Sequence, residues 1–285
     1  MSILNETYTL SNGVMIPKLG LGTWFVDDDK VAEAVRAAVE IGYRNIDTAQ
    51  AYGNERGVGE GVRTSGIARE ELFVSTKLAA EIKDYDAAVA AIDESLAKLD
   101  IGYIDLMLIH APQPWDDFRG GDYTDGNRQA WRALEEAYRA GKLRSIGVSN
   151  FVVEDLENIL DHGTVTPHVN QILVHAGNTP TELIDYCQGK DVLVQAYSPI
   201  AHGAILDNGT LAAIAARYGV SVPQLCIRYT LQLGTVSLPK TANPDHLRAN
   251  AEVDFVISDE DMDTLRPLDE TDYGEHAAFP VYSGR

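Results

Sequence analysis

Four residues of the types used in acid–base chemistry each stand at or just beyond the end of a short apolar segment: Asp47, Tyr52, Lys77 and His110. A carboxylate, a phenol, an amine and an imidazole are the groups that enzymes use to move protons. Each also has a simpler explanation, because Asp suits turns and the stem of a Lys packs along apolar surface. Since all four follow apolar segments, we expect them to meet at one edge of a sheet.

Eight short apolar runs along the chain predict the strands that position these residues. The runs are residues 19–22, 45–47, 73–77, 104–109, 145–149, 169–174, 192–197 and 236–239. Apolar residues recur at helical spacing over 30–41, 86–99, 127–140, 154–160 and 181–188, and a further helical pattern begins at Asn54. Strands and helices in alternation predict an α/β fold with a covered parallel sheet, and eight repeats favour a closed (β/α)8 TIM barrel. Residues 7–10 and 15–16 flank an Asn12-Gly13 turn, which predicts a β-hairpin that closes the bottom of the barrel.

The length of 285 residues allows either one barrel or two smaller domains. No low-complexity run or Pro/Ser-rich linker divides the chain, so we expect a single domain over residues 1–285. A doubly wound fold is disfavoured, because Gly20-Leu21-Gly22-Thr23-Trp24 lacks the glycine spacing of a dinucleotide-binding turn.

The composition limits the kinds of binding partner and the cellular compartment that we expect. The chain has 43 Asp and Glu against 23 Lys and Arg, a formal net charge of -20, which disfavours nucleic acid and anionic membranes. No signal-peptide pattern or membrane-spanning run is evident, and Cys187 and Cys226 are isolated, so we expect a cytoplasmic protein. The histidines lack metal-ligand spacing, so we expect no metal. The acidity is also typical of adaptation to high salt, in which ions screen the repulsion.

The motifs at the predicted strand ends resemble those of the aldo-keto reductases in order and spacing, over the whole chain. They are LGLGTW at 19–24, GYRNIDTA at 42–49, YGNE at 52–55, STK at 75–77, LMLIH at 106–110, GVSNF at 147–151, NQ at 170–171, AYSP at 196–199 and LPK at 238–240. The short loops and brief carboxyl terminus resemble the prokaryotic 2,5-diketo-D-gluconate reductase type. The resemblance implies a catalytic tetrad of Asp47, Tyr52, Lys77 and His110.

The chemistry of carbonyl reduction agrees with these roles, because it needs a hydride donor and a proton donor. We expect Tyr52 to donate the proton and the Lys77 ammonium to lower the pKa of its phenol. We expect Asp47 to hold Lys77 as its ion-pair partner, and His110 to donate a hydrogen bond to the carbonyl oxygen. A nicotinamide cofactor would supply the hydride.

The resemblance also implies where the cofactor binds. It assigns Ser149, Asn150 and Gln171 to the nicotinamide carboxamide, Tyr197 to the ring, Ser198 and Ile200 to the pyrophosphate, and Lys240, Thr241, His246 and Asn250 to the adenosine end. Many members have an arginine where this chain has His246. A histidine is only partly charged at neutral pH and lacks the bidentate guanidinium. We therefore expect NADPH as the cofactor, with more use of NADH than is usual in the family.

The predicted substrate pocket departs from the family pattern. Aromatic residues often follow the lysine and the histidine, and here Ala79 and Ala111 stand in that region. Trp24 remains, and we expect Trp115 to refill part of the space. A roomier or differently shaped pocket follows, for a small aldehyde or ketone with keto-sugars among the candidates. A further departure, around His175, carries no functional prediction.

Two other functions stay open at this point. A Schiff-base aldolase would use Lys77 as its nucleophile and need no nicotinamide, although Tyr52, Gln171 and Tyr197 would then have no evident purpose. A nicotinamide-binding barrel could instead sense redox state for a partner, without significant turnover. We expect a monomer, because members of this family often are.

Overall fold

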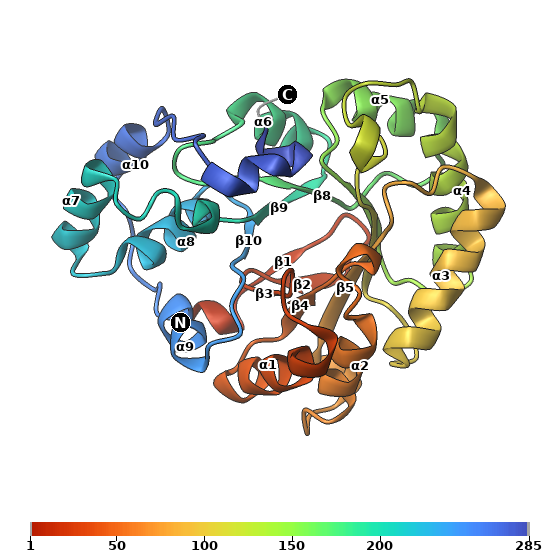
Figure 1. Cartoon of the computed structure of the whole chain (residues 1–285), viewed down its shortest axis with the longest axis horizontal. Coiled ribbons are helices and arrows are strands. Elements are labelled where there is room, and N and C mark those ends of the chain that lie inside the picture. Colours follow the sequence, from red (N-terminus) through yellow and green to blue (C-terminus); the bar gives the residue numbers. More distant parts are fainter. Residues whose placement is uncertain (1, 284–285) are drawn as a thin grey trace.

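The computed structural model describes residues 2–283, and in them eight parallel strands form a barrel surrounded by helices (Figure 1). The strands are β3 (Leu21–Gly22), β4 (Asn45–Asp47), β5 (Phe73–Leu78), β6 (Leu106–Ile109), β7 (Ile146–Ser149), β8 (Val169–Leu173), β9 (Leu193–Tyr197) and β10 (Val236–Leu238). Each pairs with the next, and bridges from Leu19 to Ser237 and from Gly22 to Lys240 join the first strand to the last. The predicted (β/α)8 TIM barrel is therefore confirmed.

The helices lie outside the barrel. They are α1 (Asp28–Ile41), α2 (Glu55–Arg63), α3 (Tyr85–Leu99), α4 (Thr124–Arg139), α5 (Val153–His162), α6 (Thr181–Gly189), α7 (Gly209–Tyr218), α8 (Val222–Gln232), α9 (Pro244–Ala251) and α10 (Asp259–Leu265). α1 to α8 connect the strands, and α9 and α10 follow the last strand. The spacing of apolar residues predicts α1 to α6 but not the last four. In that part of the chain, α7, α8 and α10 bury residues such as Leu211, Leu225 and Leu265 in a second cluster with the C-terminal segment. α8 also packs Ile227 and Leu231 into the barrel core, and its apolar residues therefore face two clusters rather than one.

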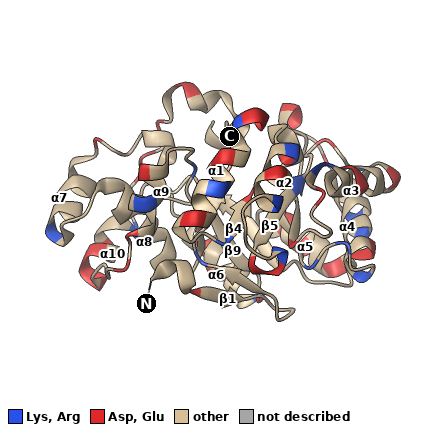
Figure 2. Ribbon diagram, turned by 90° about the horizontal axis from the view of Figure 1, so that it is seen from below, with Lys and Arg blue, Asp and Glu red and all other residues tan. Residues whose placement is uncertain are grey.

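The amino-terminal hairpin closes one end of the barrel. β1 (Thr7–Thr9) and β2 (Met15–Pro17) pair antiparallel, and Gly13 adopts a φ of 84° in the turn between them. Leu10 and Ile16 are buried in one cluster with barrel residues such as Val236. Figure 2 shows β1 and the amino terminus on the side opposite the carboxyl terminus. The predicted hairpin is present and leaves the other end of the barrel for the site.

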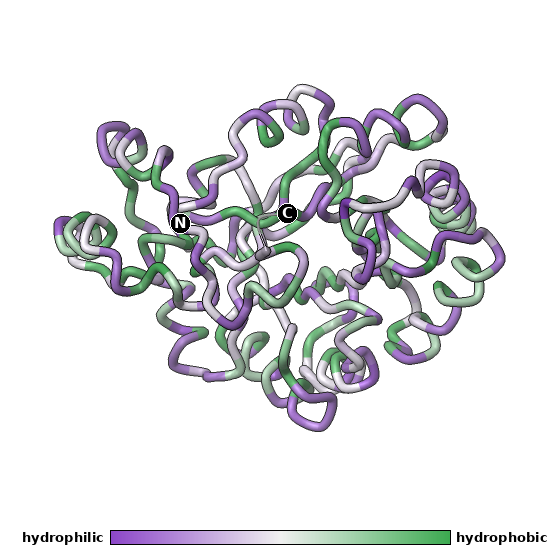
Figure 3. Tube along the Cα trace, turned by 45° about the horizontal axis from the view of Figure 1, so that its top comes forward, coloured by the Kyte–Doolittle hydropathy of each residue, from purple (hydrophilic) through white to green (hydrophobic). Residues whose placement is uncertain are grey.

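The outer helices bury their apolar side chains and expose their charged ones. On α1, Val31, Val35 and Ala38 are fully buried at helical spacing, while Glu33 and Glu40 face outward. Hydrophobic residues gather along the inner elements in Figure 3, and acidic residues lie mainly on the outer helices and loops in Figure 2. Among residues 2–283, no single helix is long and apolar enough to cross a bilayer; α7 and α8 meet that test only together, at an angle of 85°.

Candidate active site

The loop after β4 places Asp47 and Tyr52 at the carboxyl end of the barrel. Asp47 ends β4, and Tyr52 closes the single 3-10 turn Gln50–Tyr52 that precedes α2. Asn54 occupies the N-cap position of α2, but its side chain does not cap the helix. Its amide instead donates to the carbonyls of Thr23 and Val26, at 3.0 and 2.9 Å. This buried side chain ties the loops after β3 and β4 together and so fixes the turn that carries Tyr52.

Lys77 links Asp47 to Tyr52 inside the barrel. Its Nζ donates to Asp47 Oδ2 at 2.7 Å, to the Thr48 carbonyl at 2.8 Å and, more weakly, to Tyr52 Oη at 3.4 Å. Lys77 is 1% exposed and Asp47 is 4% exposed, so water does not screen the pair. From across the barrel, Gln171 Nε2 donates to Asp47 Oδ1 at 2.9 Å. The predicted Asp–Lys ion pair is present, and both of its carboxylate oxygens are engaged.

His110 follows β6 and lies edge-on to Tyr52, with the ring centroids 5.7 Å apart. Burial lowers the pKa of His110 well below its usual range, and the positive charges of Lys77 and Lys83 lower it further. The imidazole is therefore neutral at pH 7. A neutral imidazole carries one N–H, which a carbonyl oxygen can accept.

The structure corrects the prediction for the pKa of Tyr52. Burial raises the pKa of this phenol well above 10, and the Asp47 carboxylate raises it further. Burial and the Asp47 carboxylate both disfavour the phenolate, so the lowered pKa that was expected from the Lys77 ammonium is not found. Burial also lowers the pKa of Lys77, against the opposing effect of Asp47. Tyr52 is therefore protonated at neutral pH, which is the state that a proton donor requires.

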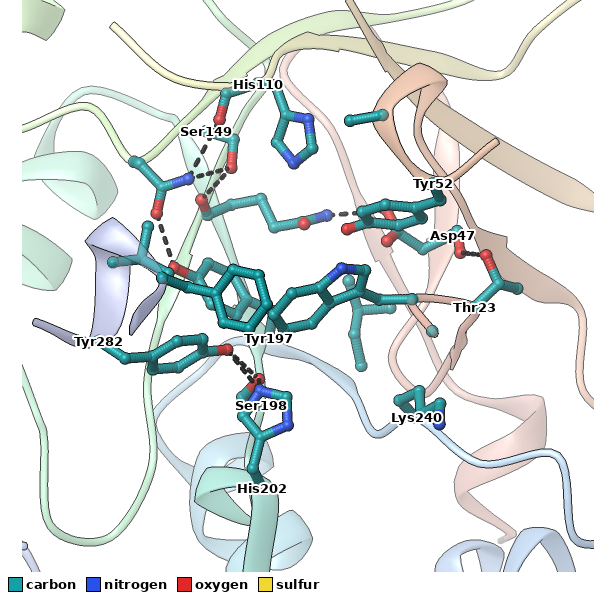
Figure 4. A pocket seen from close by; sticks show the side chains of 18 of the residues that line it. Thr23, Asp47, Tyr52, His110, Ser149, Tyr197, Ser198, His202, Lys240 and Tyr282 are labelled. Carbon is teal, nitrogen blue, oxygen red and sulfur yellow. Dashed lines mark hydrogen bonds between the residues drawn. The ribbon is translucent and has the colours of Figure 1, made fainter. Parts of the chain in front are cut away.

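These groups face a cavity of about 380 Å³ at the carboxyl end of the barrel (Figure 4). The predicted residues in its wall are Trp24, Asp47, Tyr52, His110, Trp115, Ser149, Asn150, Gln171, Tyr197, Ser198 and Lys240. Lys77 stands behind the wall, bonded to Asp47. Residues from all parts of the chain thus converge on one cavity, as the shared rim of a parallel barrel requires.

The amide of Asn150 connects three strand ends. Asn150 has a φ of 60°, in the left-handed region, and its Nδ2 donates to the His110 carbonyl and to Ser149 Oγ, both at 3.1 Å. Its Oδ1 accepts a 2.7 Å hydrogen bond from Tyr197 Oη. The ends of β6, β7 and β9 are therefore held together, and the Tyr197 ring is fixed against the cavity.

Besides Lys77, six predicted site residues lie outside the cavity wall: Ala79, Ala111, Ile200, Thr241, His246 and Asn250. Ala111 is fully buried. Ala79 uses its backbone N–H to donate to Gln50 Oε1. His246 is exposed on α9, beyond the Lys240 end of the cavity. Neither alanine therefore shapes the cavity in the way that the family pattern suggests.

The carboxyl-terminal segment supplies cavity residues that the sequence did not predict. Phe279, Pro280, Val281 and Tyr282 line the wall, and the Phe279 ring meets Trp24 edge-on at 5.1 Å. These side chains add apolar surface to the cavity wall. The only signal in the sequence was that Phe279 and Tyr282 are aromatic, because the spacing of residues 279–282 does not relate them to any strand of the barrel.

Two hydrogen bonds fasten this segment to the loop after β9. Tyr282 Oη lies 2.7 Å from Ser198 Oγ and 2.8 Å from His202 Nε2. Burial lowers the pKa of His202 to about 4, and the neighbouring His276 and Lys240 act in the same direction. His202 is neutral at pH 7 and lines the cavity, although the sequence did not single it out.

Within residues 2–283, no group of three or more His, Cys, Asp or Glu side chains is arranged to hold a metal ion.

A barrel with a buried Asp–Lys pair, a protonated phenol and a neutral imidazole around one cavity defines an enzyme of acid–base chemistry. The sequence model of the aldo/keto reductase family matches residues 18–270, so the chain belongs to that family. It is an NAD(P)H-dependent oxidoreductase that reduces carbonyl groups, as the motifs predicted.

Several relatives are similar along nearly their full length. A glyoxal reductase of Bacillus subtilis is 43% identical over 267 residues, which cover 93% of each chain. An aldo-keto reductase of Mycobacterium tuberculosis is 42% identical over 263 residues, covering 92% of this chain and 90% of the relative. Among solved structures, a Brucella melitensis aldo/keto reductase has a TM-score of 0.87 at 38% identity, covering 93% and 98% of the two chains. A Bombyx mori aldo-keto reductase in complex with NADP has a TM-score of 0.85 at 33% identity, covering 97% and 98%.

Proposed function

We propose that this protein reduces aldehydes or ketones with Tyr52 as the proton donor and His110 as the group that orients the carbonyl oxygen. The observation that supports the proposal is the protonated Tyr52 phenol in the cavity wall, beside neutral His110 and in front of the Lys77–Asp47 pair. As Tyr52 gives its proton to the carbonyl oxygen, the hydrogen bond from Lys77 stabilises the negative charge left on the phenol oxygen. Asp47 keeps Lys77 in place for this step.

The cavity suits a nicotinamide cofactor. Ser149, Asn150 and Gln171 present polar groups to one wall, and Tyr197 presents a fixed ring, which fits a planar amide-bearing heterocycle. Bound there, NADPH would supply the hydride. Lys240 is an exposed cation at the rim of a strongly acidic chain, and it suits the phosphate end of the cofactor. The solved Bombyx mori relative contains NADP, which supports NADPH for this protein.

The aromatic wall favours a small, uncharged and largely apolar carbonyl substrate. Trp24, Trp115, Phe279 and Tyr282 supply rings and few hydrogen-bond partners, so the hydroxyl groups of a keto-sugar would remain poorly satisfied. The similarity to a glyoxal reductase adds small dicarbonyl compounds to the proposed substrates. We therefore rank aldehydes above keto-sugars, against the resemblance to the 2,5-diketo-D-gluconate reductase type.

The aldolase alternative finds no support in the structure. Lys77 is bonded to Asp47 and Thr48 and does not line the cavity, so its amine is not presented to a substrate carbonyl. Redox sensing without turnover would leave the proton-donor arrangement of Tyr52 without a purpose. We also propose that the protein is a cytoplasmic monomer and that it is adapted to high salt. The acidic residues on the outer helices support the adaptation to salt.

A panel of carbonyl compounds, assayed with NADPH and with NADH, tests this proposal. The variant Tyr52→Phe removes only the hydroxyl, so we expect kcat to fall by about 10²- to 10⁴-fold while the Kd for NADPH stays within about twofold. Full activity of Tyr52→Phe would contradict the proposed proton donor. Preference for keto-sugars over simple aldehydes would contradict the proposed substrate class.

A further inference from the structure

Two side chains outside the cavity wall hold the backbone that follows His110. Lys83 Nζ donates to the Ala111 carbonyl at 2.8 Å, and Asn127 Nδ2 donates to the Pro112 carbonyl at 2.9 Å. Lys83 Nζ also donates to Asn127 Oδ1 at 2.8 Å, so the two side chains form one unit. Lys83 comes from the loop after β5 and Asn127 from α4. Two successive peptide groups are therefore bound to elements on either side of β6.

The His110 ring depends on this backbone for its orientation. Its Nδ1 is buried and has no hydrogen-bond partner within residues 2–283, so no protein side chain fixes the imidazole through that atom. The ring is placed by packing against Tyr52 and Trp115, whose centroids lie 5.7 and 5.1 Å away, and by the main chain that carries it. A shift of the peptide groups at 111 and 112 would therefore move the ring directly.

We propose that Lys83 and Asn127 are positioning residues, which clamp the chain after β6 and thereby hold His110 in its orientation for carbonyl reduction. The inference rests on the proposed function, because it assumes that His110 contacts the substrate. Neither Lys83 nor Asn127 lines the cavity, so they act through His110 and not on the substrate. Lys83 does not touch the proposed cofactor wall, which meets this backbone through a separate hydrogen bond from Asn150 to the His110 carbonyl. The clamp therefore predicts a larger effect on reduction than on NADPH affinity.

The charge of Lys83 offers a second readout. Burial lowers the pKa of Lys83 to about 7, against the opposing effect of Glu81 and Asp155. Above pH 7 the amine becomes neutral, and its hydrogen bond to the Ala111 carbonyl loses the assistance of the charge. The pKa of His110 lies well below 6.5 and that of Tyr52 well above 10, so neither group titrates in this range. An inflection of kcat/KM near pH 7, at saturating NADPH, would therefore report on Lys83.

The first test is Lys83→Met, which keeps an unbranched side chain and removes the ammonium. We expect kcat/KM for an aldehyde to fall about 10-fold at pH 6.5, the inflection near pH 7 to disappear, and the Kd for NADPH to stay within about twofold. Lys98→Met is the matched control, because Lys98 is half-exposed on α3 and pairs with Glu94. An unchanged kcat/KM with an unchanged pH profile in Lys83→Met would overturn the inference.

A second variant keeps the inference testable if Lys83→Met does not fold. Asn127→Asp retains the acceptor for Lys83 but loses the N–H donor to the Pro112 carbonyl, so kcat/KM should also fall. The added negative charge beside Lys83 raises the pKa of the amine. We expect the inflection to move from about pH 7 to a higher pH, and an inflection that stays in place would overturn the clamp.

The combination with His110→Ala separates the clamp from the proposed function. If Lys83 acts through His110, the double variant Lys83→Met/His110→Ala will have the same kcat/KM as His110→Ala alone. A full 10-fold loss on top of His110→Ala would overturn the clamp and leave the proposed function intact. Full activity of His110→Ala would overturn the proposed role of His110, and the clamp with it.

Discussion

The Lys77 ammonium lies 2.7 Å from the Asp47 carboxylate in the interior of the barrel, where neither side chain is more than 5% exposed. β4 and β5 are neighbours in the sheet, so the two residues reach the same interior region although 30 positions separate them in the chain. A buried ion pair of this kind costs free energy to desolvate, and it becomes much less favourable when one partner is removed.

Asp47→Asn should therefore destabilise the protein by roughly 3–5 kcal/mol at pH 7, because Lys77 is left as an uncompensated buried charge. Without the carboxylate, which acts to raise it, the pKa of Lys77 falls further below 10.5. A lowered pKa in the folded state makes the free energy of unfolding increase with pH up to the unfolded pKa. Urea denaturation at pH 7 and 9.5 should thus show a smaller deficit at pH 9.5.

The exposed pair between Asp93 and Lys142 provides the control for this experiment. Asp93→Asn should change the free energy of unfolding by less than about 1 kcal/mol at both pH values, as surface pairs generally do. Equal deficits of Asp47→Asn at pH 7 and 9.5 would contradict the proposed charge state of Lys77.

His175 should make the protein sensitive to acid. Its Nε2 lies 2.8 Å from Tyr273 Oη, and burial lowers the pKa of His175 to about 4. Between pH 6.5 and 4 the unfolded state binds a proton that the folded state does not, so the free energy of unfolding falls as the pH decreases. This residue should contribute a loss of about 3 kcal/mol over that range. In His175→Leu the pH dependence should be shallower by that amount, and parallel curves for the two proteins would refute the prediction.

His246→Arg should increase the preference for NADPH over NADH. A guanidinium at this exposed position of α9 can bind a 2′-phosphate with two hydrogen bonds and a full charge. We expect the ratio of the kcat/KM values for the two cofactors to rise by about 10-fold, which corresponds to about 1.4 kcal/mol.

Arg248 supplies a control for the cofactor experiment. Its guanidinium pairs with Asp245 on the same helix, at 3.0 Å, and both side chains are exposed. Arg248→Gln should therefore leave the cofactor ratio unchanged. An unchanged ratio in His246→Arg would show that this position of α9 does not contact the 2′-phosphate.

High salt should stabilise the protein. The net charge of -20 creates repulsion in the folded state, and at 1 M salt the screening length falls to about 3 Å. We expect the Tm and the activity to rise between zero and 1 M KCl. NaCl at the same ionic strength should have the same effect, because screening depends on ionic strength. A steady fall of both quantities with KCl would show that the acidity is not an adaptation to salt.

The sequence by itself determined the barrel and the meeting of Asp47, Tyr52, Lys77 and His110 at the carboxyl end of its strands. Short apolar runs and helical spacing are local patterns, and eight of them in alternation leave few folds other than a closed barrel. Because every strand in such a barrel points the same way, residues such as Asp47, Lys77 and His110 must share one rim. That inference needs no knowledge of side-chain contacts, and it held.

Only the tertiary structure decided the properties that arise from burial and from contacts between distant segments. The pKa of Tyr52 is raised because the folded chain removes the phenol from water, and no local pattern records that removal. Phe279 and Tyr282 close the cavity through contacts with Trp24 and Ser198, which lie far away in the chain. The Lys83–Asn127 unit likewise exists only once α4 packs beside the loop after β5. A sequence indicates which residues are buried, whereas the partners they meet depend on how the whole chain is packed.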